Sequence, residues 1–360
     1  MYVQASFELW LGSQTAQSKS RINNLGHDSH KAARVIMVRS AVTEGGGGGT
    51  LTEVAVCTGE GEDSLQYPFS LCSLREKLPA GTYALRGPNG DLPKPDAAAL
   101  SWALGSYSFD RYKSKSGSEA SAEAGAAVEE KVLAWPGGGD RHKVSATAAS
   151  TFLVRDLIST QSEDMGPQHL EDVMASLSKE FHGNVRSVKG DALLKEGDSY
   201  PMVMTVIHAI GCAAVPGREP RLLDLTWTPP NSEGNPNLPK VTLVGKGVCF
   251  DTGGLDPKPA AGTLTMKKDM GGGAQVLGLA RMIMAQELPV RLRVLVPAVE
   301  VAIGGDDEFK PGCVLVARDG TKSKIGSTEN AEGLLVLADA LVEASSESPD
   351  LIIDCATLTG

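Results

Sequence analysis

Apolar runs typical of buried strands alternate with helical patterns along the second half of this chain. The strand-like runs lie near 203–208, 241–245, 292–299 and 351–356, and the helical patterns lie near 271–287 and 331–345. Strands that alternate with helices are typical of α/β proteins, in which helices cover both faces of a sheet. The sequence therefore predicts an α/β fold with a mostly parallel, helix-covered sheet in this half.

The first half of the chain has the pattern of a smaller α/β domain. The expected strands are Arg34–Ser40, Leu51–Thr58, Leu78–Leu85 and Lys131–Trp135. A helix is expected over Ala97–Gly105, with Gly105 as the glycine just past its end, and two more helices over Ser145–Ser159 and Pro167–Phe181. A length of 360 residues is enough for two domains. We expect an unassigned N-terminal segment at 1–30, an N-terminal α/β domain at 31–144, a linking helix at 145–160 and a larger domain at 161–360.

Charge and composition narrow the possible partners and locations. The formal net charge is −10, so the chain has no electrostatic reason to bind nucleic acid or an anionic membrane. No run approaches the roughly 18 apolar residues that a membrane helix needs. The six cysteines form no CxxC pair, which favours reduced thiols. We expect a cytoplasmic protein, and a mitochondrial or plastid matrix is the alternative.

Charged residues of both signs lie on glycine-rich backbone directly after the run at 241–245. They are Lys246, Asp251, Lys258 and Asp269, and a second cluster, Glu329, Asn330 and Glu332, precedes the next helix. Each could be an ordinary solvated loop charge. As a set, however, they fall beyond the carboxyl ends of strands, where open α/β sheets bind ligands. Carboxylates with a lysine among them suit a hard or borderline divalent metal. Cys249 is a packed side chain or, less favoured, a thiolate ligand, because Val248 and Phe250 flank it.

Five segments carry a resemblance to a known family. GKGVCFDTGG, KPA, MKKDMGG, AEGLLVLADAL and ATLTG resemble the leucyl aminopeptidase family, the two-metal hexameric aminopeptidases. FLVRDLIST with DMGP at 152–167 and RLLDL at 221–225 also match, so the resemblance covers Leu78 to Gly360.

The resemblance implies roles for particular residues. In such enzymes two divalent ions, Zn or Mn, polarise the peptide carbonyl and activate water. The residues that match the metal ligands are Lys246, Asp251, Asp269 and Glu332, with position 330 as a further ligand. Lys258 matches the lysine that stabilises the oxyanion of the tetrahedral intermediate. The segment that lines the substrate pocket corresponds to Thr357, Leu358, Thr359 and Gly360.

The chain departs from the family pattern in three ways. Asn330 stands where the family has a metal-binding aspartate, so we expect one ion or none instead of two. Leu334 stands where the family has an arginine that holds a bicarbonate acting as base, and a leucine cannot bind an anion. The family's catalytic domain also continues past ATLTG for roughly a hundred residues. We therefore expect an incomplete domain whose last strand has an unpaired edge or an uncovered apolar face.

Two functions follow from these observations. The first is hydrolysis of N-terminal residues from peptides, with activity impaired by Asn330 and Leu334. The second is a catalytically degenerate structural or regulatory subunit of an oligomeric complex. The sequence does not decide whether the chain is an active enzyme or such a subunit. The resemblance implies a homo-oligomer, a hexamer in the family, or a place in a larger complex.

Overall fold

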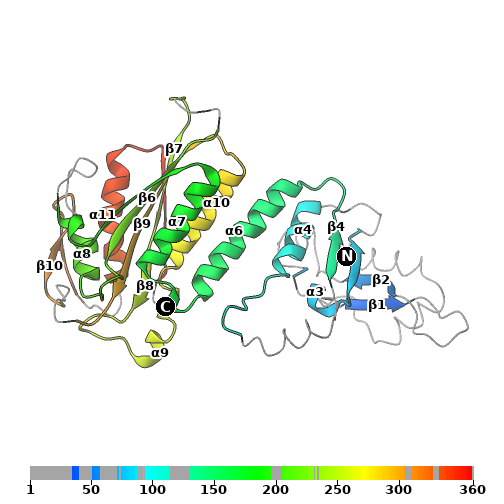
Figure 1. Cartoon of the computed structure of the whole chain (residues 1–360), viewed down its shortest axis with the longest axis horizontal. Coiled ribbons are helices and arrows are strands. Elements are labelled where there is room, and N and C mark those ends of the chain that lie inside the picture. The colour runs from blue at the N-terminus through cyan, green and yellow to red at the C-terminus, as the bar shows by residue number, and fades with distance from the viewer. Residues whose placement is uncertain are drawn as a thin grey trace, which may run out of the picture. The chain divides into compact units, whose positions relative to one another are not determined.

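The computed structural model describes residues 35–39, 51–56, 71–72, 74–86, 92, 94–113, 130–195, 204–230, 232, 235–304, 310–326 and 332–358. The chain divides into two units, Met1–Ala148 and Ala149–Gly360. Figure 1 shows their elements, and each unit is described by itself. The glycine run Gly45–Gly49, which the sequence predicts as a hairpin loop between the first two strands, lies outside the described residues, as do the first 30 residues.

The first unit contains the strands that the sequence predicts there. Strands β1 (Val35–Arg39) and β2 (Leu51–Val56) pair antiparallel, and β3 (Gly81–Ala84) pairs parallel with β4 (Lys131–Ala134). The short helix α3 (Leu74–Lys77) and the longer α4 (Pro95–Leu104) accompany them. A small core formed by Leu71, Leu78, Ala98 and Trp102 packs against Tyr83 of β3 and Leu133 of β4.

Gly105 lies just past the end of α4, as expected, but its backbone is not in the left-handed conformation that is common for such glycines. Its φ and ψ are −72° and −9°, which is right-handed helical backbone. Space explains the glycine instead, because a Cβ at this position would overlap the Cys72 carbonyl oxygen. Close approach of two backbone segments is the second common reason for a glycine.

The second unit is built on a six-stranded sheet. Its strand order is β12-β7-β9-β6-β5, and β8 pairs with the end of β9. The strands are β5 (Asn184–Lys189), β6 (Arg221–Trp227), β7 (Lys240–Gly245), β8 (Gly247–Asp251), β9 (Arg291–Val301) and β12 (Leu351–Cys355). The pairings β12–β7, β7–β9 and β8–β9 are parallel, and β5–β6 and β6–β9 are antiparallel. The sheet is thus mostly parallel, as predicted.

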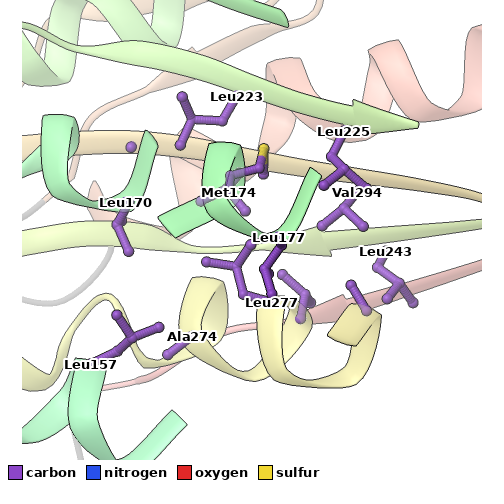
Figure 2. Packing of buried hydrophobic residues seen from close by; sticks show 14 of the residues in the cluster. Leu157, Leu170, Met174, Leu177, Leu223, Leu225, Leu243, Ala274, Leu277 and Val294 are labelled. Carbon is purple, nitrogen blue, oxygen red and sulfur yellow. The ribbon is translucent and has the colours of Figure 1, made fainter. Parts of the chain in front are cut away.

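Helices cover both faces of this sheet (Figure 1). On one face lie α7 (Pro167–Phe181) and α10 (Gly271–Ala285), with the end of α6 (Arg141–Ser159). On the other lie α8 (Thr205–Gly211) and α11 (Glu332–Ser346). Neighbouring strand residues alternate between the two cores, as Leu222 and Leu223 do. Figure 2 shows the first core, where Leu170 and Met174 of α7 pack towards the sheet.

Several short strands, helices and turns complete the described part of the unit. Strands β10 (Val314–Val316) and β11 (Lys322–Lys324) pair antiparallel. The loop after β8 contains the short α9 (Ala260–Thr263) and the 3₁₀ turn η5 (Met266–Lys268). Two further 3₁₀ turns, η3 (Ser162–Asp164) and η4 (Gly190–Leu194), flank α7 and β5. No helix among the described residues is long and apolar enough to cross a membrane.

The strand expected near 203–208 is wrong, because this segment forms α8. Every residue of α8 from Val206 to Gly211 is buried. A segment buried on all sides has no polar face, so its hydrophobic periodicity does not separate a helix from a strand. The glycines around Lys246 predict a turn between Lys246 and Asp251, and this is partly wrong, since Gly247–Asp251 forms β8.

A buried network of charged residues joins the sheet to α11. Asp224 of β6 accepts hydrogen bonds from Arg293 Nε at 3.1 Å and Nη2 at 2.8 Å, and from Arg186 Nη2 at 2.7 Å. Arg293 also pairs with Glu343 of α11 at 2.7 Å. Buried charges are tolerated when they are paired in this way, so the network fixes α11 against the sheet.

Strand β12 is the outermost strand on one side of the sheet. Its Leu351 and Ile353 are 49% and 37% exposed. Its other edge pairs with β7 in register from Leu351↔Val241 to Cys355↔Gly245. The carboxyl ends of β7 and β12 therefore lie side by side, and the residues that follow them enter the same region.

Candidate metal centre

Lys246 lies where β7 ends and β8 begins, and backbone hydrogen bonds fix its position. Its N–H donates to the Cys355 carbonyl at the end of β12, at 2.9 Å. Its own carbonyl accepts from the N–H of Gly273 in the first turn of α10, at 2.7 Å. Two strand ends and a helix start thus converge on one lysine. This is the place where open α/β sheets bind ligands.

The Lys246 side chain turns into a buried polar cluster. Its Nζ lies 2.8 Å from Asp269 Oδ1 and donates to the Thr357 carbonyl at 2.9 Å. The Thr357 hydroxyl is 2.8 Å from the same Asp269 Oδ1 and 3.0 Å from the Asp269 carbonyl. Lys246 and Asp269 are 4% and 3% exposed. A lysine and a carboxylate held this deep in the fold must compensate each other's charge.

A second lysine–carboxylate pair lies on the loop after β8. Lys258 Nζ is 3.0 Å from Asp251 Oδ2, and both residues are buried. Asp251 Oδ1 accepts from the Gly253 N–H at 2.9 Å, and the Lys258 N–H donates to the Thr252 carbonyl at 3.0 Å. Gly253 has φ +86°, a left-handed value that glycine adopts without strain. The tight turn is what brings Lys258 back onto Asp251.

Gly333 in the first turn of α11 closes the site on its remaining side. A Cβ at Gly333 would overlap Lys246 Nζ and Cε, and it would lie 3.4 Å from Asp269 Oδ2. The backbone of α11 therefore approaches the lysine amine as closely as it can without a side chain. The sequence pattern does not reveal this role of Gly333, although the glycine stands beside Glu332 in the matched motif.

The Asp269 carboxyl group has a shifted pKa, and its two oxygens differ in their hydrogen bonds. Burial raises the pKa of Asp269 above its ordinary value, and the negative charge of Asp251 adds to this. The charge and hydrogen bond of Lys246 and the hydrogen bond of Thr357 oppose the rise. Oδ1 receives both hydrogen bonds, whereas the buried Oδ2 has no hydrogen-bond partner among the described residues. A buried carboxylate oxygen without a donor is suited to a cation, so these residues fit a divalent metal.

The structure thus brings Lys246, Asp269 and Thr357 together by direct contact, and Lys258 and Asp251 as a second pair. Asn330, Thr359 and Gly360 lie outside the described residues, as does the Glu332 side chain. Among the residues that are described, no three His, Cys, Asp or Glu side chains form a metal-binding group. The described members of the predicted ligand set are two carboxylates, Asp251 and Asp269, and one lysine, Lys246. Leu334 and Leu358 are 45% and 59% exposed.

Cys249 is a core side chain. It is fully buried, and its thiol donates to the Gly247 carbonyl at 3.6 Å. Burial raises the pKa of this thiol well above its ordinary value. A protonated thiol is a poor metal ligand, so the packed interpretation is the one that the geometry supports.

These features define an α/β protein with a buried lysine–carboxylate centre at the carboxyl ends of parallel strands. Comparison with known proteins identifies its family. Residues 152–360 match the catalytic domain of the cytosol aminopeptidase family, and residues 1–123 match an M17 aminopeptidase N-terminal domain. The chain belongs to the cytosol aminopeptidase family, which confirms the resemblance to leucyl aminopeptidases.

Particular relatives show how far the similarity extends. A probable cytosol aminopeptidase of Chlamydia trachomatis serovar A is 41% identical over 212 residues, which are 58% of this chain and 40% of the relative. The chain thus matches about 40% of the length of such curated relatives.

Two solved structures are similar over almost the whole chain. The cytosol aminopeptidase of Coxiella burnetii has a TM-score of 0.81 and 38% identity, over 98% of this chain and 68% of that one. The bottromycin maturation enzyme BotP, solved in complex with Mn, has a TM-score of 0.75 and 29% identity, over 97% and 70%. Both support the α/β fold described above.

Proposed function

We propose that this protein is a metal-dependent aminopeptidase of low turnover. The observation that carries the proposal is the buried cluster of Lys246, Asp269 and Thr357, in which one carboxylate oxygen has no donor within the described part of the chain. Membership of a peptidase family supports the reaction class, and peptides are the proposed substrates. The N-terminal residue that is removed is proposed to be apolar.

The residues that would hold the metal are Lys246, Asp251, Asp269 and Glu332. Oxygen and nitrogen ligands of this kind suit Zn or Mn. The Mn complex of BotP supports Mn as the first ion to test. A bound divalent ion polarises the peptide carbonyl and activates water for attack on it.

Lys258 has the chemistry of an oxyanion stabiliser. Its ammonium carries three N–H donors and is buried beside Asp251. In a site from which water is excluded, a fixed positive charge stabilises developing negative charge more strongly than it would in water. Asp251 holds the ammonium in place, so the charge is oriented before substrate arrives.

Two substitutions are the reason for the proposed low turnover. Asn330 offers an amide oxygen where the family pattern has a carboxylate, so we expect one bound ion or none instead of two. Leu334 is 45% exposed on the first turn of α11 and presents an apolar side chain where the family has an arginine. A hydrocarbon side chain binds no anion, and general-base assistance is typically worth about 10²–10⁴-fold in rate.

The same two positions favour a second function. A chain that keeps the fold but has lost a metal ligand and the anion-binding arginine could act as a structural or regulatory subunit of an oligomer. The family assembly implied by the resemblance, a hexamer, is the proposed oligomeric state in either case. We also propose a cytosolic location and domain boundaries at 31–144, 145–160 and 161–360.

One experiment separates the two functions. The full chain is stripped with a chelator, reloaded with Mn²⁺ or Zn²⁺, and assayed for bound metal and for hydrolysis of leucyl amide. Lys258→Ala is compared with Lys322→Ala, which removes an exposed lysine of β11. Hydrolysis that Lys258→Ala abolishes and Lys322→Ala retains supports the aminopeptidase. Bound metal without any hydrolysis supports the subunit, and absence of both overturns the metal centre.

A further inference from the structure

Thr357 contacts both Lys246 and Asp269, although it follows a different strand from either. It comes two residues after the end of β12. Its hydroxyl lies 2.8 Å from Asp269 Oδ1 and 3.0 Å from the Asp269 carbonyl. Its carbonyl accepts from Lys246 Nζ at 2.9 Å. One residue thus holds two of the side chains that would bind the metal.

Packing fixes the direction of the Thr357 hydroxyl. A Cβ added at Gly271, the first residue of α10, would lie 2.8 Å from Thr357 Cγ2. The threonine methyl therefore fills the space that this glycine leaves against the helix. With the methyl seated there, a β-branched side chain has little freedom at χ1, and its hydroxyl is directed to Asp269.

The hydrogen bonds decide which oxygen of Asp269 is presented to a ligand. Oδ1 lies 2.8 Å from Lys246 Nζ and 2.8 Å from the Thr357 hydroxyl. Oδ2 is buried, has no hydrogen-bond partner among the described residues, and would lie 3.4 Å from a Cβ added at Gly333. Two donors on one oxygen prevent rotation of the carboxylate. Outer partners of metal ligands commonly act in this way.

We propose that Thr357 is a positioning residue of the metal centre, whose hydroxyl orients Asp269 so that Oδ2 is the oxygen offered to a divalent cation. This goes beyond the pocket-lining role that the family resemblance gives to this segment. It rests on the proposed metal-binding function. In this proposal the hydroxyl acts on the metal site through Asp269, which it contacts directly.

The test compares Thr357→Val with Thr357→Ser in the chelator-stripped full chain. Valine keeps the methyl against Gly271 and loses the hydroxyl, whereas serine keeps the hydroxyl and loses the methyl. Calorimetric titration with Mn²⁺, and separately with Zn²⁺, measures the affinity. We expect Thr357→Val to weaken binding by about 10–100-fold, the range found for outer partners of metal ligands, and Thr357→Ser to bind close to the parent.

Each alternative outcome has a distinct meaning. Equal affinity of parent and Thr357→Val overturns the inference while the metal centre stands. Equal weakening by both variants would mean that keeping the hydroxyl does not preserve the affinity, and it also overturns the inference. A parent that binds neither ion overturns the proposed metal centre together with this inference. If Thr357→Val does not fold, Thr357→Ala against Thr357→Ser gives the same comparison, because those two differ only in the hydroxyl.

Discussion

Replacement of Gly333 by alanine should break the Lys246–Asp269 contact. A Cβ at Gly333 would come well under 3.0 Å from both Nζ and Cε of Lys246, a separation that real Cβ atoms do not show. The atoms in the way belong to the flexible end of a lysine, so the side chain can move aside. The cost is therefore not the overlap itself but the hydrogen bonds that the amine must give up.

The magnitude follows from those bonds. Lys246 Nζ would lose Asp269 Oδ1 at 2.8 Å and the Thr357 carbonyl at 2.9 Å. Hydrogen bonds to charged groups contribute about 1.5–3 kcal/mol each. Alanine in place of a helical glycine returns up to about 1 kcal/mol. We expect Gly333→Ala to lower the free energy of unfolding by about 2–5 kcal/mol.

A double-mutant cycle in urea provides the assay. In the Lys246→Ala background the obstructing amine is absent, so Gly333→Ala should become neutral or stabilising by up to about 1 kcal/mol. The sign of the effect therefore changes between the two backgrounds. Equal destabilisation by Gly333→Ala in both would refute the reasoning, since the clash would then lie with something other than the lysine.

Three further predictions concern other parts of the second unit. Burial opposes ionisation of Asp224, but the hydrogen bonds and charges of its two arginines outweigh burial and hold its pKa below the ordinary value. A depressed folded-state pKa gives stability that is complete above the unfolded value of about 3.9 and is lost as pH falls through the folded value. Asp224→Asn should thus lower the urea midpoint at neutral pH and flatten its decline below about pH 4; an unchanged acid profile would contradict this. Gly278→Ala would overlap Val154 Cγ2 of α6 and should cost about 1–3 kcal/mol, and Val154→Ala in the same chain should recover part of the loss. The double change Asn330→Asp with Leu334→Arg should raise leucyl-amide hydrolysis by more than the two single changes combined, because such groups act as a unit; rapid hydrolysis by the parent would show that neither position limits the rate.

Much of the second unit could be predicted from sequence because its elements are long and periodic. The apolar face of the segment from Pro167 to Phe181 gave α7 with its correct bounds. The segment that forms α8 could not be predicted, since burial on every side removes the pattern that distinguishes helix from strand. The strand β8 was missed because it is short and starts at a glycine, which is typical of a turn.

The sequence proposes which residues form the candidate site but not the contacts between them. Lys246 and Asp269 could be placed at the ends of strands and helices, where ligands gather. That Lys246 pairs with Asp269, and Lys258 with Asp251, depends on loop geometry that no short-range pattern encodes. The role of Gly333 depends on a helix far along the chain, and the contact of Thr357 depends on the register of β12 with β7.

Charge balance explains why repair of this site should need both positions 330 and 334. Lys246 neutralises the charge of Asp269, and Lys258 neutralises the charge of Asp251. Attraction for a divalent cation must then come from the remaining acidic groups, and Asn330 in place of aspartate removes one of them. Leu334→Arg alone adds positive charge next to a centre that already lacks negative charge, so by itself it should weaken cation binding. Asn330→Asp restores a negative charge that offsets the positive charge of Leu334→Arg. In the double variant the new arginine can therefore hold an anion without weakening cation binding.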